Sequence, residues 1–503
     1  MPPLLALFSW PLVVLALARK FTPALAFILA ILAGFLLLPP TITYDLPLLP
    51  ALTKDSIPAL SVLLLLALFR SRLGGGEERR LLPQSRFIWI ASIGLAAGAL
   101  ATVVTNGDPL FYGPRVLPGM RLYDGLSQVL SAFILLLPML LARKFLATPE
   151  THVLLLKALC VAGLSYSLLA LVEVRMSPQL NQWIYGFFPH SFIQHYRSGG
   201  WRPIVFLNHG LVVSLFFCLA TLAAAGLSRL DGKRRSNFLA ATAWLLLTLV
   251  LTKSLGALVI ALLLLPAVLF LGVRSQLIVA CSVAIMVLSY PVARSSGFIP
   301  IERILQEAGK VDPARADSLL TRVRNEDMML DKALDRPWFG WGAWGRSRVF
   351  DSATGADVTI SDGYWIIVLG VGGWTRYLFE FGLLCIPLIL MFLRCRQYDI
   401  GMESAILSLI LAANLIDLIP NSGLTPLTWI IAGALRGRLE LGRIEVATES
   451  ERDTVSKRVN ASYSRAPAHR DKGAAEDPSL SPNHYTRQTS RHERRRARGT
   501  GDG

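Results

Sequence analysis

The stretch IVFLNHGLVVSLFFCLATLAAAGL, residues 204–227, contains no Asp, Glu, Lys or Arg. An α-helix needs about 20 consecutive apolar residues to cross the hydrocarbon core of a bilayer, because each residue adds about 1.5 Å. A helix on the surface of a soluble protein would instead place polar residues along one of its sides. We therefore predict that this stretch is a transmembrane helix.

Similar apolar runs follow one another along most of the chain. Of its 503 residues, 53% are hydrophobic and only 17% are charged, whereas soluble domains carry about 25% charged residues. The other runs cover residues 4–18, 21–38, 57–69, 87–104, 126–142, 153–172, 238–251, 255–272, 277–292, 364–373 with 377–393, 402–419 and 424–435. We expect an all-α, polytopic membrane bundle of about 12–13 spans, in which 4–18 and 364–373 could also be re-entrant.

Lys and Arg are concentrated in alternate connections between these runs. The basic connections contain residues 19–20, 70–80, 143–144, 229–235, 274, 394–396 and the segment from 436 onward. Positively charged connections remain in the cytoplasm, so the other set faces outward. That outer set comprises residues 39–56, 105–125, 173–203 and 293–363. The first run lacks the basic flank of a signal peptide, so we expect it to be retained. The pattern predicts a multi-pass protein of a bacterial inner membrane.

The alternation divides the chain into four parts. Residues 1–292 are expected to form an N-terminal transmembrane bundle, 293–363 a large periplasmic loop, and 364–436 the C-terminal spans. Residues 437–503 are polar and end in RHERRRARGTGDG, so we predict a disordered basic cytoplasmic tail. Its Arg cluster either contacts anionic lipid headgroups or is a solvated segment that reinforces the orientation. The five Cys lie in or beside spans, so neither disulfides nor a zinc site is expected.

The largest outer loop contains DRPWFGWGAWGRSR, residues 335–348. The flat apolar faces of Trp338, Trp341 and Trp344 would suit stacking against sugar rings. Alternatively, they anchor the loop at the membrane surface, where Trp is enriched. Arg346 and Arg348 follow, and a guanidinium group can bind phosphate oxygens with two hydrogen bonds. The combination favours a lipid-linked sugar phosphate as the ligand.

The surrounding segment, TRVRNEDMMLDKALDRPWFGWGAWG…SDGYWIIVLGVGGWTRYLFEFGLL at residues 321–384, resembles the O-antigen ligase/polymerase superfamily. Arg322 matches the family Arg, and Pro337, Gly340 and Gly342 match its P-x-x-G-x-G motif. The sequence EFGLL, residues 380–384, matches the closing element. Weaker similarities are LTKSLGAL at 251–258, RPIVFLNHG at 202–210 and IPNSGLTPLTWIIAGALRG at 419–437.

The resemblance implies a fold of the GT-C type and an inverting, metal-independent glycosyltransferase without cofactors. A glycan would move from a polyprenyl-diphosphate-linked donor to the hydroxyl of a glycan or lipid-linked acceptor. The partners would be these substrates, the bilayer, and possible flippase and chain-length proteins, with no role for nucleic acid. Family ligases carry a His at Asp362 or its neighbour, and residues 293–363 contain no His. This departure favours a polymerase over a ligase.

Residue roles follow from the resemblance. Arg322 would neutralise the diphosphate leaving group, and Asp362 would take the proton of the acceptor hydroxyl. Further substrate contacts are assigned to five cationic residues and to the three Trp of the outer loop. These residues are Arg324, Arg202, Lys253, Arg346, Arg348, Trp338, Trp341 and Trp344. Two alternatives remain open, in which the arginines pair with acidic residues of the loop helix and Asp362 caps the helix that follows it.

Two other functional classes were considered. A transporter or flippase of lipid-linked glycans would show internal repeats with broken helices near the membrane midplane. The sequence contains no evident repeat, and its polar motifs are concentrated in one outer loop. A non-catalytic assembly scaffold is compatible with the same composition.

Overall fold

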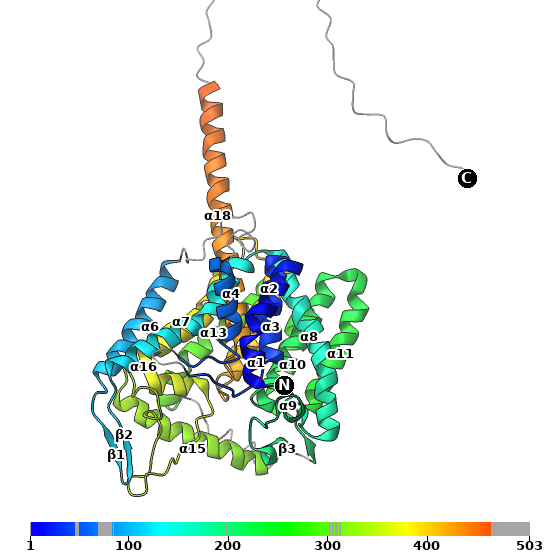
Figure 1. Cartoon of the computed structure of the whole chain (residues 1–503). Helices are drawn as coiled ribbons and strands as arrows, with labels where there is room; N and C mark the ends of the chain where they lie inside the picture. Colours follow the sequence, from blue (N-terminus) through cyan, green and yellow to red (C-terminus); the bar gives the residue numbers. More distant parts are fainter. Residues whose placement is uncertain are drawn as a thin grey trace, which may run out of the picture. The chain divides into compact units, whose positions relative to one another are not determined.

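The computed structural model describes residues 2–463, apart from 46–49, 69–82, 84, 198, 299, 301–302, 304–305, 307–309 and 311–312. Residues 1–448 form one compact unit, and residues 449–503 belong to a second unit. The described part of the first unit is a helical bundle with two short β-hairpins (Figure 1).

The helices of the first half are α1 (Pro3–Phe8), α2 (Trp10–Lys20), α3 (Pro23–Leu37), α4 (Ile57–Leu68), α6 (Arg86–Val104), α7 (Leu122–Phe145), α8 (Pro149–Met176) and α9 (Leu180–Tyr185). Those that follow are α10 (Gly210–Leu230), α11 (Arg235–Leu251), α12 (Leu255–Phe270), α13 (Val273–Ser295), α15 (Pro313–Asp335), α16 (Tyr364–Arg394), α17 (Met402–Asp417) and α18 (Pro426–Tyr463). Short 3-10 helices are η1 (Phe192–His195) and η2 (Gly232–Arg234). Strand β1 (Leu110–Tyr112) pairs with β2 (Arg115–Leu117), and β3 (Tyr196–Arg197) pairs with β4 (Gly200–Trp201), both antiparallel.

Helix α10 lies at the centre of the bundle. Every residue from Val213 to Ser228 is buried, and the helix packs against α8, α11, α12 and α17. Small residues allow this close approach, as membrane helices require. A Cβ atom added at Gly226 would lie 2.6 Å from Ile406 in α17. Residues 210–227 of the uncharged stretch therefore belong to an inner helix of the bundle, whereas residues 204–209 precede it as non-helical backbone.

Among the described residues, seven helical segments are long and apolar enough to cross a membrane: Pro3–Lys20, which joins α1 and α2, and α6, α7, α8, α10, α13 and α16. Three shorter apolar helices, α3, α4 and α12, accompany them. This confirms the all-α, polytopic membrane fold. The expected count of about 12–13 spans also included helices shorter than 18 residues, such as α11 and α17.

The two runs predicted at 364–373 and 377–393 form one helix, α16, of 31 residues. One residue inside it, Gly373, has non-helical angles (φ 62°, ψ −164°). The two predicted runs are therefore two helical segments that meet at a kink, because the chain changes direction at Gly373 and then resumes its helix.

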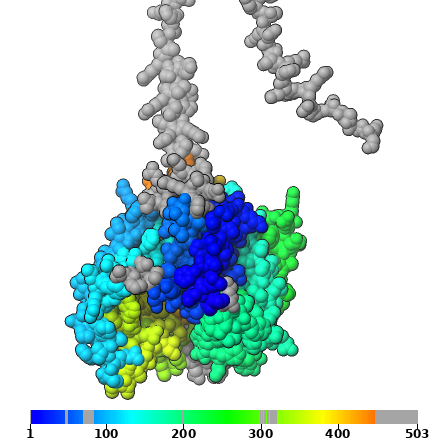
Figure 2. All heavy atoms as spheres, in the orientation of Figure 1, coloured from blue at the N-terminus to red at the C-terminus, as the bar shows by residue number. Residues whose placement is uncertain are grey.

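The connections predicted to face outward gather at one end of the bundle. Helices α9 and α15 and both hairpins lie at this end (Figure 1). In Figure 2 the yellow-green side chains of the largest loop lie beside the light blue segment that contains β1 and β2. The two segments touch closely, since a Cβ atom at Gly113 would lie 2.2 Å from the carbonyl oxygen of Ala353. The connections 105–125 and 293–363 are thus in contact with each other.

Helix α18 extends to Tyr463, which differs from the prediction of a disordered tail from residue 437. Ion pairs account for the first part of this extension. Glu440 accepts a hydrogen bond from Arg143 of α7, and Arg438 donates to the carbonyl oxygen of Tyr398 at 2.8 Å. These contacts hold the helix against the bundle past the predicted boundary. Residues 464–503 of the predicted tail lie outside the described residues.

Candidate active site

Arg322 and Asp362 meet where α15 passes the start of α16. Met329, Leu330 and Ala333 of α15 are buried, so the apolar side of this helix faces the bundle and its polar side remains accessible. Arg322 Nε lies 3.3 Å from Asp362 Oδ2, and the two side chains are 33% and 35% exposed. The structure therefore brings together the two residues that were predicted to be catalytic.

Asp362 does not occupy the capping position of α16. That position belongs to Gly363, and no side chain caps the helix. The start of α16 is held through its backbone, since the Tyr364 N–H donates to the carbonyl oxygens of Leu418 at 3.0 Å and Asn421 at 3.1 Å. The alternative of Asp362 as a helix cap is therefore wrong, and its carboxylate faces the guanidinium group instead.

Glu326 lies one helical turn after Arg322 and joins α15 to its surroundings. Trp365 Nε1 donates to Glu326 Oε1 at 3.3 Å. Arg294 approaches the same carboxylate at 3.9 Å and forms a 2.5 Å ion pair with Asp327. Burial raises the pKa of the Glu326 carboxyl above its ordinary value. No role at the site was predicted for Glu326 from the sequence, although its four-residue spacing from Arg322 places both residues on one face of a helix.

A cavity of 380 Å³ lies between α6, α7 and α16. Its polar lining includes Tyr364, which donates a hydrogen bond to Glu380, and Arg376, whose Nε lies 2.9 Å from the same carboxylate. Trp344 of the large loop also lines it. The cavity thus extends from the charged residues Arg376 and Glu380 of α16 to Trp344 of the large loop. Tyr364, which also lines it, lies two residues after Asp362 in the sequence.

The stretch 336–348, here called the Trp loop, completes the broken helix α16. A break leaves backbone groups without helical partners, and such groups must be satisfied within a membrane protein. Four backbone hydrogen bonds from the Trp loop do this: Trp341 N–H to Gly370 O (2.9 Å), Gly342 N–H to Val371 O (2.9 Å), Trp374 N–H to Pro337 O (2.7 Å) and Thr375 N–H to Trp338 O (3.1 Å).

The glycines of the P-x-x-G-x-G motif are required by this contact. Gly340 has φ +66°, and a Cβ atom there would lie 2.6 Å from the backbone carbon of Val371. Gly342 has φ +87°, and its Cβ atom would lie 2.3 Å from Met120 Sδ. Positive φ angles and close backbone approach both favour glycine. The motif therefore allows the Trp loop to pack closely against the break in α16.

The three Trp of the loop differ in their surroundings. Trp341 Nε1 donates to the carbonyl oxygen of Lys332 at 2.6 Å, and the Arg336 guanidinium lies 4.3 Å from its ring centroid. This ring is part of the loop's internal packing. Trp338 and Trp344 are 67% and 57% exposed. The predicted stacking surface of three rings is thus reduced to these two.

Arg346 and Arg348 bind the protein's own groups. Arg346 is 2% exposed, and its nitrogens donate to carbonyl oxygens that include Pro118 at 2.7 Å and Asp108 at 3.0 Å. Arg348 forms an ion pair with Asp357 at 2.8 Å. Arg346 thereby ties the Trp loop to the connection around β1 and β2, which is a positioning contact rather than a phosphate clamp.

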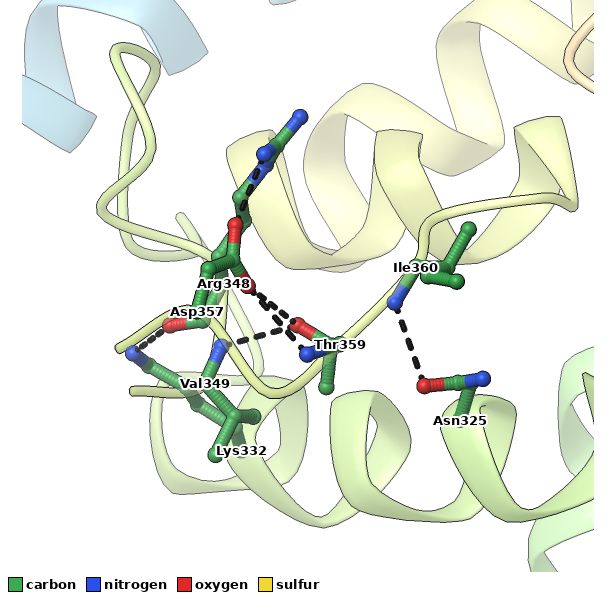
Figure 3. A network of polar contacts seen from close by, with 7 residues as sticks. All are labelled: Asn325, Lys332, Arg348, Val349, Asp357, Thr359 and Ile360. Atoms are coloured by element: carbon green, nitrogen blue, oxygen red, sulfur yellow. Dashed lines mark hydrogen bonds and ion pairs between the residues drawn. The ribbon is translucent and has the colours of Figure 1, made fainter. Parts of the chain in front are cut away.

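Figure 3 shows how the polar connection before Asp362 is fixed. Thr359 Oγ1 accepts from the Val349 N–H at 3.2 Å, and Asn325 Oδ1 of α15 accepts from the Ile360 N–H at 3.1 Å. Partial burial opposes ionisation of Asp357, but hydrogen bonds from Arg348 and Thr359 lower its pKa overall. This network holds residues 357–360 against α15 and so delivers Asp362 to Arg322.

The remaining predicted cations fall into two groups. Arg324 is exposed on α15, two residues from Arg322. Arg202 is 3% exposed and donates to the carbonyl oxygen of Lys253 at 3.3 Å. Arg202 and Lys253 precede α10 and α12, so this contact joins the starts of these two helices.

Residues 240–364 match the family model of the O-antigen ligase domain. The matched segment contains Lys253, Arg322, the Trp loop and Asp362. The match confirms the resemblance to the O-antigen ligase/polymerase superfamily and indicates an enzyme with ligase- or polymerase-type activity on lipid-linked glycans. A search of curated proteins gave no match.

Proposed function

We propose that the chain is a glycan polymerase, or less favoured a ligase, acting at the outer face of a bacterial inner membrane. The donor is a glycan on polyprenyl diphosphate, and the acceptor is a hydroxyl of another glycan or lipid-linked glycan. The observation that carries the proposal is the Arg322–Asp362 pair, which lies inside the family-matched segment at the outer end of α16.

The pair supplies the two functions that the transfer needs. The acceptor hydroxyl gives its proton to the Asp362 carboxylate while its oxygen bonds to the anomeric carbon. The bond from that carbon to the diphosphate oxygen breaks, the configuration inverts, and polyprenyl diphosphate leaves. Arg322 offsets the charge that builds on this leaving group. Donor binding therefore moves the guanidinium from Asp362 to the diphosphate and releases the carboxylate as a base.

The adjacent cavity supports transfer rather than transport. It extends from Arg376 and Glu380 to Trp344 of the Trp loop, so a lipid-linked glycan could lie with its headgroup beside Asp362. Trp338 and Trp344 expose the faces on which a sugar could stack. A flippase would need a pathway that crosses the midplane to both sides, whereas the residues that line this cavity come from α6, α7, α16 and the Trp loop.

Asp362→Asn tests the proposal. Asn is close in shape and neutral, so it cannot accept the proton, and we expect polymer formation to fall at least about 100-fold. Asp351→Asn is the matched control, because Asp351 lies in the same loop but accepts its hydrogen bonds from Ala353 and Thr354 of its own turn, outside the network that positions Asp362. Polymer yield and length are measured on gels from cells that lack the native chain, with protein abundance measured in parallel. Near-native polymer from Asp362→Asn at normal abundance would remove Asp362 as the base.

A further inference from the structure

Three of the seven histidines of the chain lie together in the described structure. His190 follows α9, His195 ends η1, and His209 is the N-cap of α10. Their ring centroids are 5.5 Å (His190–His195), 5.2 Å (His195–His209) and 4.9 Å (His190–His209) apart. One ring nitrogen of each lies within 4.8 Å of the other two, an arrangement that no other His, Cys, Asp or Glu group among the described residues repeats.

This spacing is close to that of metal ligands. Zn²⁺ binds imidazole nitrogens at about 2.0–2.1 Å, which separates the nitrogens of a tetrahedral site by about 3.3 Å. Side-chain rotations that move each ring nitrogen by about 1 Å would bring the three nitrogens to that separation. Imidazole ligands without carboxylates suit Zn²⁺, Cu²⁺ or Ni²⁺, whereas Mg²⁺ and Ca²⁺ need oxygen ligands. The nearby carboxylate of Glu173 is engaged by the backbone N–H groups of Ile204 and Val205, at 2.8 and 2.7 Å.

We propose that His190, His195 and His209 form a Zn²⁺ site with an open fourth position. His195 is buried, His209 is half-buried and His190 is exposed, so the metal would enter from the His190 side. The Arg202 N–H donates to the carbonyl oxygen of His195 at 2.8 Å, which fixes that residue from behind. Arg202 and Lys253 add positive charge near the site, so the fourth ligand would be anionic, either hydroxide or a phosphate oxygen.

The site would act as a clamp on the connection between α8 and α10. His209 Nδ1 accepts a hydrogen bond from the Leu211 N–H at 3.1 Å. Metal binding exchanges this cap bond, because Nδ1 either binds the metal itself or becomes protonated when Nε2 binds it. In return, the loop before η1 and the end of η1 become joined to the start of α10. The proposal is independent of the glycan transfer, and it departs from the expectation of a metal-free protein that the family resemblance gave.

Metal binding by the purified full-length chain in detergent tests the site. After treatment with EDTA, we expect calorimetry to show one Zn²⁺ bound per chain and the thermal midpoint to rise with Zn²⁺ concentration. Co²⁺ in place of Zn²⁺ should give the strong visible absorption of a four-coordinate ion. Weak octahedral-type absorption, or no midpoint change with Zn²⁺ in excess, would overturn the proposal.

Variants separate this site from other histidines. His190→Gln alters an exposed residue and should weaken Zn²⁺ binding at least about 100-fold while leaving the metal-free thermal midpoint unchanged. The matched control replaces His469, His484 and His492 with Gln, because these residues lie outside the described part of the chain. The control should still bind one Zn²⁺. Loss of binding in the control, or full binding by His190→Gln, would assign the metal elsewhere.

Discussion

The Trp loop and the Arg322–Asp362 pair lie in the same outer connection and use polar and aromatic residues in opposite ways. The Trp loop attracts attention in the sequence, yet its backbone, Trp341 and Arg346 are engaged in holding the broken helix α16 and the neighbouring connection. Arg322 and Asp362 do not stand out from their neighbours in the sequence, but both of their side chains are one-third exposed. The residues that hold the site in place thus have their hydrogen-bonding atoms bound to the protein's own backbone. The side chains of Arg322 and Asp362 contact each other and remain partly exposed.

The largest expected effect concerns the residues that hold the site in place. Gly340→Ala places a Cβ atom 2.6 Å from the backbone of Val371 at φ +66°, so we expect destabilisation of about 4 kcal/mol or more and little folded protein. Gly345→Ala is the matched control, since it also has positive φ but its nearest atom, Phe350 Cζ, is 3.9 Å away. It should cost only about 1 kcal/mol. Folded protein is measured by size-exclusion chromatography in detergent, and equal yields of both variants would contradict the crowding argument.

Arg322 tests the partly exposed pair. Arg322→Ala should lower transfer about 10²–10³-fold, the loss typical of removing one group that stabilises transition-state charge. Arg322→Lys keeps the charge without the planar fork and should retain part of the activity. Both variants should fold normally, because the replaced side chain is partly exposed. Near-native polymer from both at normal abundance would place the diphosphate contact elsewhere.

The Trp residues sharpen the comparison within one loop. Trp341→Ala removes the ring that bonds Lys332 and contacts Arg336, so it should cost about 2–3 kcal/mol of stability. Trp338→Ala and Trp344→Ala remove exposed rings and should leave stability within about 1 kcal/mol, while polymer yield falls several-fold. Thermal midpoints and polymer yield are compared for the three variants. Loss of stability in Trp338→Ala and full polymer from both exposed variants would return these rings to an anchoring role.

The smallest expected effect concerns Glu326, which bonds structural neighbours and also lies one helical turn from Arg322. Because its pKa is raised in the folded chain, its contribution to stability is present at low pH and is lost as pH rises through the folded-state pKa. Glu326→Gln removes that loss, so the variant should gain relative to the native chain between acidic and neutral pH, by less than about 1 kcal/mol. Thermal midpoints of the two chains are compared across this range. A gap that narrows with rising pH would show that the carboxylate stabilises the fold.

Much of the fold could be predicted from local sequence. The uncharged run 204–227 identifies α10 because span length and composition are local properties. The loop helix with which the arginines were expected to pair is α15, and it ends at Asp335, since Pro337 cannot continue a helix interior. The glycines at 370, 372 and 373 carried a signal for the break in α16, but the two apolar runs on either side were treated as separate segments.

The site was predictable in its residues and not in its contacts. Arg322 and Asp362 could be named from the family resemblance, but their pairing depends on how α15 folds back over α16. Trp341 and Arg346 were assigned to substrate because residue type suggests what a side chain can bind. Their partners are carbonyl oxygens of Lys332 and Pro118, and every residue carries such an oxygen, so no pattern of side chains reveals which one is used.

The break in α16 determines when this part of the chain can finish assembling. A ribosome makes the Trp loop before it makes residues 370–375, so the loop already exists when the second half of α16, residues 374–394, is made. The first half then has exposed backbone groups at Gly370 and Val371 until Trp341 and Gly342 dock on them. The break in this span is therefore closed only after the loop and both halves of α16 have been made. A chain halted before that docking would expose unpaired carbonyl oxygens to lipid, where each unsatisfied backbone group costs several kcal/mol.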